Sequence, residues 1–201
     1  SPLTSSTLAE TVSDAQWYYS FSPSSQAWTV RSSSYAMNPG YGYAVTASQS
    51  GSFPLNHTAS FTGSAFNNGD VAVALGFVGS AGAGDDDWNL LGNPYPSAID
   101  ADAFLAANSA TVGGTLYFWT HDTPDTSGNN VSTDYVAWNG AGGTAGCSSG
   151  VNLCILPNGF IASGQGFFAE AIAAGSATFT NAIRVSGSNT QFYKGATTQN
   201  E

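Results

Sequence analysis

Apolar and polar residues alternate in short runs along this chain, and Gly, Pro, Asn and Ser separate the runs. In Tyr43-Ala44-Val45-Thr46, and again at 71–75, the odd-numbered positions share one face of an extended strand. Val, Tyr, Phe, Trp and Thr are abundant in these runs, as is typical of strands. The pattern predicts half-buried antiparallel sheets, with strands at residues 16–21, 42–47, 58–61, 70–77, 115–120, 134–138, 166–171 and 177–179.

Helical signals are few. Ser97 and Asp100 have the spacing of a capping box, with Ser97 as the N-cap, ahead of residues 101–108. A weaker copy of the same signal lies at residues 5–12. We therefore expect two short helices, one in each half of the chain.

Motifs rich in aromatic residues and glycine occur twice, in the same order. The pairs are Trp17-Tyr18-Tyr19 with Leu116-Tyr117-Phe118-Trp119, Trp28 with Trp138, Asn38-Pro39-Gly40-Tyr41-Gly42-Tyr43 with Gly164-Gln165-Gly166-Phe167-Phe168, and Ala59-Ser60-Phe61-Thr62 with Ala177-Thr178-Phe179-Thr180. The spacing between copies varies, which loop insertions at 122–134 and 139–159 explain. An internal duplication accounts for this order, and coincidence within a β-rich chain is the alternative.

Residues 1–84 and 85–201 are therefore expected to form two β halves that pack together as one unit. The stretch 76–87, rich in small residues, is the expected junction. The predicted fold class is all-β, of the antiparallel β-sandwich type, with two pseudo-duplicated halves that each contain one short helix.

Composition limits the possible partners. The chain has three basic and thirteen acidic residues, which gives a net charge of −10, and only 8% of its residues are charged. Nucleic-acid binding is excluded because phosphate neutralisation needs clustered Lys and Arg, and the same argument excludes an anionic membrane surface. No apolar run reaches the roughly 18 residues of a membrane span, so we expect no membrane insertion. Hydrophobic residues make up 42% of the chain, which is enough for a core.

Cysteine usage and composition indicate an exported protein. Cys147 and Cys154 lie in a Gly/Ser-rich stretch without Cys-x-x-Cys spacing, and no further Cys completes a metal site. A local disulfide is the expected state, and two free buried thiols are the alternative. Residues 1–4 contain neither a basic region nor an apolar run, so we expect a mature or excised piece of a longer protein, without a signal peptide.

One segment resembles a known motif. Residues 88–100 read Trp-Asn-Leu-Leu-Gly-Asn-Pro-Tyr-Pro-Ser-Ala-Ile-Asp, which closely resembles the W-N-L-x-G-N-P-Y-P-S-A-I-D motif of extracellular modules in large secreted or surface proteins of Bacteroidota. Further matching stretches extend the resemblance over almost the whole chain, at residues 37–43, 61–63, 67–70, 161–168 and 179–185.

The resemblance implies a location and an architecture. Proteins of this group are typically exported by the type IX secretion system and carry a separate C-terminal sorting domain, so the resemblance implies a fragment of such a protein. The group includes adhesins, uncharacterised surface proteins and some polysaccharide-active enzymes, and it brings no catalytic residues with it. Independently, Pro94 and Pro96 restrict the backbone. We expect a rigid strand–turn–helix corner there, with a binding site as the alternative.

Signals of catalysis are weak. No G-x-S-x-G motif occurs, and neither His57 nor His121 has the sequence context of a triad. Glycoside hydrolysis needs two carboxylates across a cleft, but Asp100 and Asp102 diverge on the predicted helix and Glu170 is expected to face solvent. We therefore expect no enzymatic activity.

Calcium is the one metal that the sequence suggests. Asp122, Asp125, Asn129 and Asp134 cluster in one long predicted loop, and their oxygen atoms are the type of ligand that Ca²⁺ accepts. The acidic triplet at 85–87 is a second candidate. The spacing matches no EF-hand, and exposed acidic loops are commonly only solvated, which is the alternative.

Aromatic side chains are the candidate ligand-binding groups, because flat rings stack on the faces of sugar rings. Trp119, Tyr135 and Trp138 flank the long loops of the second half and are the surface candidates, with core packing as the alternative. Four aromatic residues in other strands are expected to be buried instead: Trp28, Phe61, Trp88 and Phe179.

Three functions follow from these observations. The first is a non-catalytic extracellular module of a secreted or cell-surface bacterial protein, with an adhesive or structural role. The alternatives are a carbohydrate-binding accessory module of a polysaccharide-degrading enzyme and a self-assembling subunit of an extracellular fibre or sheath. The expected partners are extracellular glycans, copies of the same chain and neighbouring domains.

Overall fold

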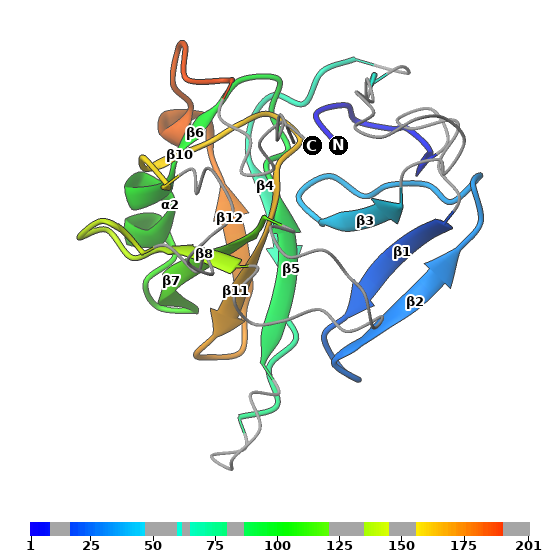
Figure 1. Ribbon diagram of the computed structural model, residues 1–201, viewed down its shortest axis with the longest axis horizontal. Coiled ribbons are helices and arrows are strands. Elements are labelled where there is room, and N and C mark those ends of the chain that lie inside the picture. Colours follow the sequence, from blue (N-terminus) through cyan, green and yellow to red (C-terminus); the bar gives the residue numbers. More distant parts are fainter. Residues whose placement is uncertain are drawn as a thin grey trace, which may run out of the picture.

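The computed structural model describes residues 1–8, 17–46, 60–61, 65–79, 87–120, 135–144 and 156–190, and its regular structure is mostly strand (Figure 1). The elements in chain order are β1 (Trp17–Ser22), β2 (Ala27–Arg31), β3 (Tyr43–Thr46), β4 (Val71–Ala74), β5 (Trp88–Gly92), β6 (Ile99–Asp100), α2 (Ala101–Ala107), β7 (Val112–Trp119), β8 (Tyr135–Trp138), β9 (Gly143–Thr144), β10 (Phe160–Ile161), β11 (Gly166–Ala171), β12 (Ser176–Phe179) and the 3₁₀ helix η2 (Asn181–Ile183). All strand pairs are antiparallel. The predicted all-β class is confirmed.

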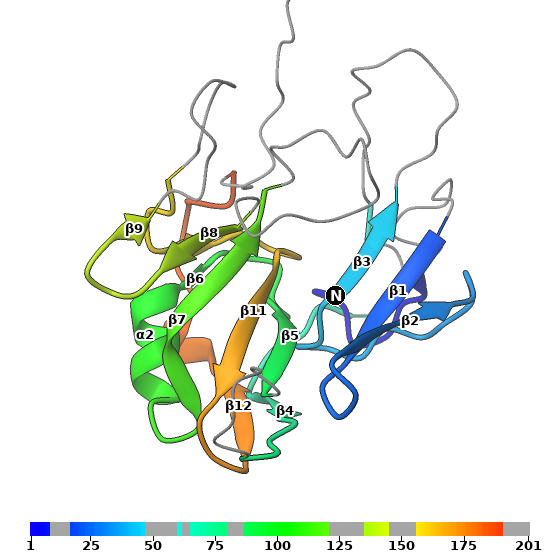
Figure 2. The same ribbon diagram turned by 60° about the horizontal axis from the view of Figure 1, so that its bottom comes forward.

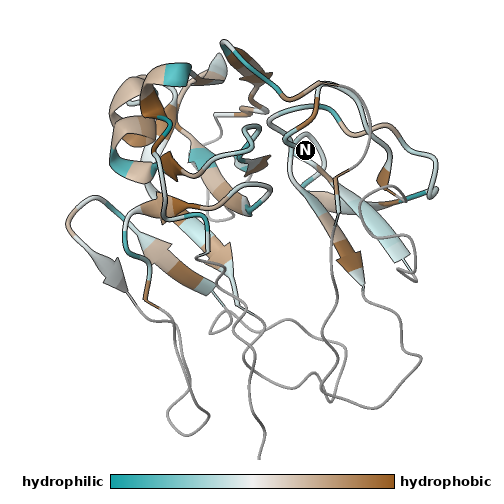
Figure 3. Ribbon diagram, turned by 90° about the horizontal axis from the view of Figure 1, so that it is seen from above, coloured by the Kyte–Doolittle hydropathy of each residue, from teal (hydrophilic) through white to brown (hydrophobic). Residues whose placement is uncertain are grey.

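The main core lies on one face of the five-stranded sheet β5-β11-β7-β8-β9. Phe104 of helix α2 lies on this face, with its ring centroid 5.5 Å from that of Phe167 and 4.9 Å from that of Phe179. All three side chains are buried, and Figure 3 shows hydrophobic strand segments beside the helix. The contact joins helix, central sheet and the β4–β12 ribbon into one core. No helix within the described ranges is long and apolar enough to cross a membrane.

Helix α2 forms where it is predicted, but its cap is a different residue. The N-cap is Asp100, whose Oδ1 accepts a hydrogen bond from the Ala103 nitrogen at 2.9 Å. Ser97 was the expected N-cap, and this expectation is wrong. The reason is that Ile99 and Asp100 are held extended as strand β6, paired with β10, so the helix begins only at Ala101.

A buried asparagine holds the corner between β5 and α2. The side-chain nitrogen of Asn93 donates to the main-chain oxygens of Ser97, Ile161 and Ala162, and its Oδ1 accepts from the Tyr95 nitrogen. The side chain is fully buried. Its amide therefore replaces the main-chain partners that the two prolines of this corner cannot supply.

A second, smaller sheet has the order β2-β1-β3 and lies beside the first (Figure 2). One of its faces carries buried Tyr18, which packs with Leu8 and Met37 in a separate small core. Successive strand residues point to opposite faces, so Phe21 and its cross-strand partner Trp28 lie on the other face. That second face is turned toward the five-stranded sheet, because Phe21 and Trp28 contact a residue of β11.

The two sheets share a pattern of pairing. β1 lies between β2 and β3, as β7 lies between β8 and β11. Tyr19 opposes Ala44 in the first set, and Tyr117 opposes Phe168 in the second. The turn before β3 and the turn before β11 each contain an i to i+3 hydrogen bond, Tyr41 to Asn38 and Gln165 to Ala162. Duplication would produce this correspondence, and it stays a prediction, as does the sandwich arrangement.

The first half contributes to both cores. Strand β4 of the first half pairs with β12 of the second, and buried Val73 of β4 belongs to the main core. Residues 9–12 of the helix predicted at 5–12 lie outside the described residues, as do residues 58–59 of the strand predicted at 58–61.

Candidate functional site

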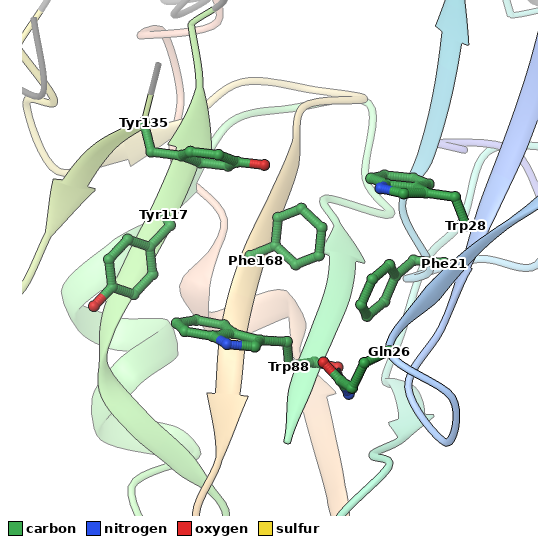
Figure 4. Close-up of a pocket in the computed structure, with 7 residues that line it drawn as sticks. All are labelled: Phe21, Gln26, Trp28, Trp88, Tyr117, Tyr135 and Phe168. Atoms are coloured by element: carbon green, nitrogen blue, oxygen red, sulfur yellow. Dashed lines mark hydrogen bonds between the residues drawn. The ribbon is translucent and has the colours of Figure 1, made fainter. Parts of the chain in front are cut away.

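A cleft of about 510 Å³ lies between the two sheets, and its walls are almost entirely aromatic (Figure 4). Both halves of the chain contribute to it. Its lining residues are Phe21, Gln26, Trp28, Trp88, Tyr117, Tyr135 and Phe168.

The wall from the second half belongs to the outer face of the five-stranded sheet. In β11, buried Phe167 and Ala169 alternate with half-buried Phe168, which points away from the core. Tyr117 of β7 is the cross-strand partner of Phe168 and therefore shares its face. The Tyr135 ring lies 6.2 Å from that of Phe168. Alternation along each strand thus separates a core face from a cleft face.

The wall from the first half is a cross-strand aromatic pair. Phe21 of β1 opposes Trp28 of β2, with ring centroids 5.4 Å apart in edge-to-face geometry. Both rings also contact Phe168, at 5.1 Å and 6.0 Å. Phe168 of the second-half wall therefore contacts the first-half wall, and Figure 4 shows it facing Phe21 and Trp28. Trp28 is 43% exposed, so a large part of its surface is open to the cleft and to solvent.

One residue of the cleft lining, Gln26, has a strained backbone. Gln26 has a positive φ of 48°, in the left-handed region that non-glycine residues seldom adopt. Its side-chain nitrogen donates to the main-chain oxygens of Pro23 at 2.6 Å and Trp88 at 3.1 Å. The Gln26 side chain thus joins the β1–β2 turn to strand β5 across the two sheets. Strain of this kind is commonly retained at binding sites.

The cleft has polar groups but no charged side chain among its described lining residues. The polar groups are phenol, indole and amide. In Figure 4 the Tyr135 hydroxyl and the Trp28 indole nitrogen point toward the space around Phe168, whereas the Tyr117 hydroxyl points away from it. The chain as a whole carries a net charge of −10. The site can therefore take a neutral ligand with apolar faces and hydrogen-bonding edges.

The three aromatic residues proposed from the sequence lie in different environments. Tyr135 lines the cleft, and Trp119 is its cross-strand partner, 38% exposed. Trp138 lies on the opposite face, where it packs against the main core and its Nε1 donates to Asp102 Oδ1 at 2.6 Å. The structure brings Trp119 and Tyr135 together and separates both from Trp138. Ligand binding by these residues stays a prediction.

Sequence reasoning missed most of the cleft. Phe179 is buried as expected, but Trp28 is exposed and Phe61 and Trp88 are half-buried, so the expectation that these three are buried is wrong. Trp88 lies in β5, which has apolar residues on each face, because Leu90 and buried Leu91 point in opposite directions. Apolar residues on both faces of a short strand are the signal that indicates a second buried or ligand-facing surface.

The remaining predicted sites fall partly outside the described residues. Four candidate calcium ligands and both cysteines lie there: Asp122, Asp125, Asn129, Asp134, Cys147 and Cys154. Within the described part of the chain, no group of three or more His, Cys, Asp or Glu side chains could hold a metal. Glu170 is exposed as expected. Asp100 and Asp102 serve as helix cap and partner of Trp138, which are structural roles.

Comparison with known proteins gives one match. The family described as a domain of unknown function (DUF8693) matches residues 1–201. Neither a curated protein nor a solved structure matches the chain.

Proposed function

The chain belongs to the DUF8693 family, a domain of unknown function, and we propose that it is a non-catalytic extracellular module that binds a neutral carbohydrate through its aromatic cleft. Of the three functions that the sequence suggests, the proposal puts carbohydrate binding first. Adhesion is then its consequence, because a module that holds a polysaccharide attaches the longer protein, or the cell that bears it, to that polysaccharide.

The observation that carries the proposal is a charge-free cleft with aromatic rings on both walls. A sugar ring has C–H groups on its faces and hydroxyl groups around its edge. The faces pack on aromatic side chains, while the edges bond to phenol, indole or amide groups. Phe168 and Trp28 supply such rings, and the hydroxyl of Tyr135 and the side-chain oxygen of Gln26 supply such polar groups.

The openness of the cleft favours a sugar over a purely apolar ligand. Trp28 is 43% exposed and Tyr117 and Tyr135 are half-buried, so a bound molecule keeps one side in water. A sugar leaves its outer hydroxyl groups hydrated there, whereas an apolar ligand would leave unburied apolar surface.

A binding role fits the described carboxylates better than a catalytic one. Asp100 caps helix α2 and Asp102 holds Trp138, and neither lines the cleft. Asp87 accepts hydrogen bonds from the main-chain nitrogens of Val78 and Gly79. Paired carboxylates facing a bound sugar, which glycoside hydrolysis needs, do not occur among the described lining residues. The extracellular location is supported by composition and by the resemblance described above.

A glycan array tests the proposal. The purified chain is expected to bind neutral glucans, xylans or mannans, and anionic polysaccharides less well. Trp28→Ala is expected to lower the affinity at least tenfold, because it removes one ring of the wall. Phe66→Ala is the matched control, since Phe66 is 62% exposed but lies outside the lining. A folded protein that binds no neutral glycan would overturn the proposal.

A further inference from the structure

We infer that the binding surface continues beyond the cleft as an aromatic track from Tyr19 to Trp119, and that its ligand is a neutral oligosaccharide chain of several sugar units. This inference rests on the proposed function and specifies the length of the ligand. The track consists of Tyr19, Trp28, Phe21, Phe168, Tyr135 and Trp119.

At the first-half end, the track extends along β1. Tyr19 lies two residues before Phe21, so both side chains are on the same face of the strand. The Tyr19 ring is 6.4 Å from that of Trp28, edge to face at 78°. Tyr19 is half-buried and Trp28 exposed, so the aromatic surface continues past the cleft toward the start of β1.

At the second-half end, the track continues through Tyr135 to Trp119. Tyr135 lies 6.2 Å from Phe168, and Trp119 is the cross-strand partner of Tyr135. Cross-strand partners share a face of the sheet with side chains in contact distance. Trp119 is 38% exposed. The described rings therefore link the two ends of the track through Phe168, with centroid distances of 6.4, 6.0 and 6.2 Å for the three measured steps from Tyr19 to Tyr135.

The strand register relates the aromatic pair of the smaller sheet to the aromatic pair of the five-stranded sheet. When Tyr19 is matched to Tyr117 by their partners in β3 and β11, Phe21 of β1 corresponds to Trp119 of β7. Their partners Trp28 and Tyr135 then correspond as well, so this register matches Trp28 to Tyr135 and not to Trp138, the match that the order of motifs in the sequence suggested. Each sheet thus supplies one aromatic cross-strand pair at the same position. A ligand made of repeated units is the kind that two similar binding surfaces in a row accommodate.

Ligand binding would also explain why large apolar side chains are exposed along the track. Large apolar side chains are exposed at Trp28, Val30 and Trp119 on this surface, which lowers solubility unless the patch binds something. The cleft buries only the middle of the track. A single sugar unit in the cleft would leave both ends of the track unoccupied, whereas a chain covers them.

Affinity as a function of ligand length tests the inference. The probes are cello-, xylo- and manno-oligosaccharides of two and of six sugar units, titrated calorimetrically into the purified chain. The six-unit member of the series that binds is expected to bind at least tenfold more tightly than the two-unit member. Trp119→Ala is expected to remove most of this difference while leaving the affinity for the two-unit probe within twofold, and Tyr19→Leu to act in the same way.

Three controls keep the outcomes distinct. Trp119→Tyr retains a ring and is expected to keep the length dependence, and Phe66→Ala is expected to change nothing; circular dichroism shows whether each variant is folded. If two-unit and six-unit probes bind equally, the track is wrong and the proposed function stands. The track is also wrong if folded Trp119→Ala keeps the full length dependence. If no probe binds, both the proposed function and the aromatic track are wrong.

Discussion

The side-chain nitrogen of Gln26, in the β1–β2 turn, donates a hydrogen bond to the main-chain oxygen of Trp88 in β5 at 3.1 Å, and the two residues are 62 positions apart in sequence. This hydrogen bond connects two residues that line the cleft, and it fixes the position of the first-half wall relative to β5. Gln26 also carries the positive φ of 48°. The strained backbone and the hydrogen bond that positions the cleft wall therefore belong to one residue.

Replacement of Gln26 separates these two effects. Gln26→Ala keeps the strain and loses the bond to Trp88, so we expect lower stability and several-fold weaker glycan binding. Gln26→Gly also loses the bond but relieves the strain, so it should be more stable than Gln26→Ala by about 1 kcal/mol, with binding equally weak. Urea unfolding and calorimetric titration measure both quantities. Equal glycan affinities of Gln26→Ala and the original chain would show that this bond does not shape the cleft.

Trp138 is expected to matter for stability and not for binding. Its indole nitrogen donates to Asp102 Oδ1 at 2.6 Å, which fastens helix α2 to strand β8. Trp138→Phe keeps a ring against the core but loses this bond, so the unfolding free energy should fall by about 1 kcal/mol. Glycan affinity should stay within twofold, because Trp138 faces away from the cleft. A large loss of affinity with an unchanged unfolding midpoint would contradict this assignment.

Asn93 is expected to be one of the most sensitive positions of the chain. Its amide nitrogen donates to three main-chain oxygens in the buried corner between β5 and α2. Asn93→Ala leaves these acceptors without their donor and opens a small cavity, so we expect a loss of roughly 3 kcal/mol or more. Chemical denaturation measures it. Asn68→Ala is the matched control, since Asn68 is exposed and should lose less than about 1 kcal/mol.

Stability should fall steeply at alkaline pH because of Tyr95. The pKa of Tyr95 is raised to about 12, chiefly by burial and also by the Asp70 carboxylate, although the Arg184 guanidinium above the ring acts to lower it. Below pH 10 the phenol is neutral in both states. Between pH 10 and 12 the unfolded chain ionises first, so about 2 to 3 kcal/mol of stability is lost as pH rises.

Tyr95→Phe isolates this contribution. The variant loses the bond from the Tyr95 hydroxyl to the Gly69 oxygen, at 2.7 Å, so it should be less stable at pH 8. Its unfolding free energy should then decline less between pH 10 and 12 than that of the original chain. Burial also raises the pKa of Tyr43, which keeps some alkaline dependence in the variant. Identical slopes for the two proteins would contradict the role given to Tyr95.

The local pattern of the sequence predicts most strands but not how the sheets face each other. β11 forms at 166–171 as expected, because alternation and turn residues act locally. The cap of α2 shifts from Ser97 to Asp100 because β6 pairs with β10, which is distant in sequence. The cleft depends on the approach of Phe21 and Trp28 to Phe168. Nothing in the spacing of these residues indicates that contact, so only Tyr135 among the predicted ligand-binding residues proves to line the cleft.

Indole resonances give the most direct test of carbohydrate binding by the aromatic cleft. The chain has five Trp residues, and single Trp→Phe variants assign their indole N–H signals in a ¹⁵N-labelled sample. Addition of the six-unit oligosaccharide with the highest affinity is expected to shift the signals of Trp28 and Trp88, which line the cleft, and to leave that of Trp138 in place. Saturable binding with unshifted Trp28 and Trp88 signals would contradict a carbohydrate site in the aromatic cleft.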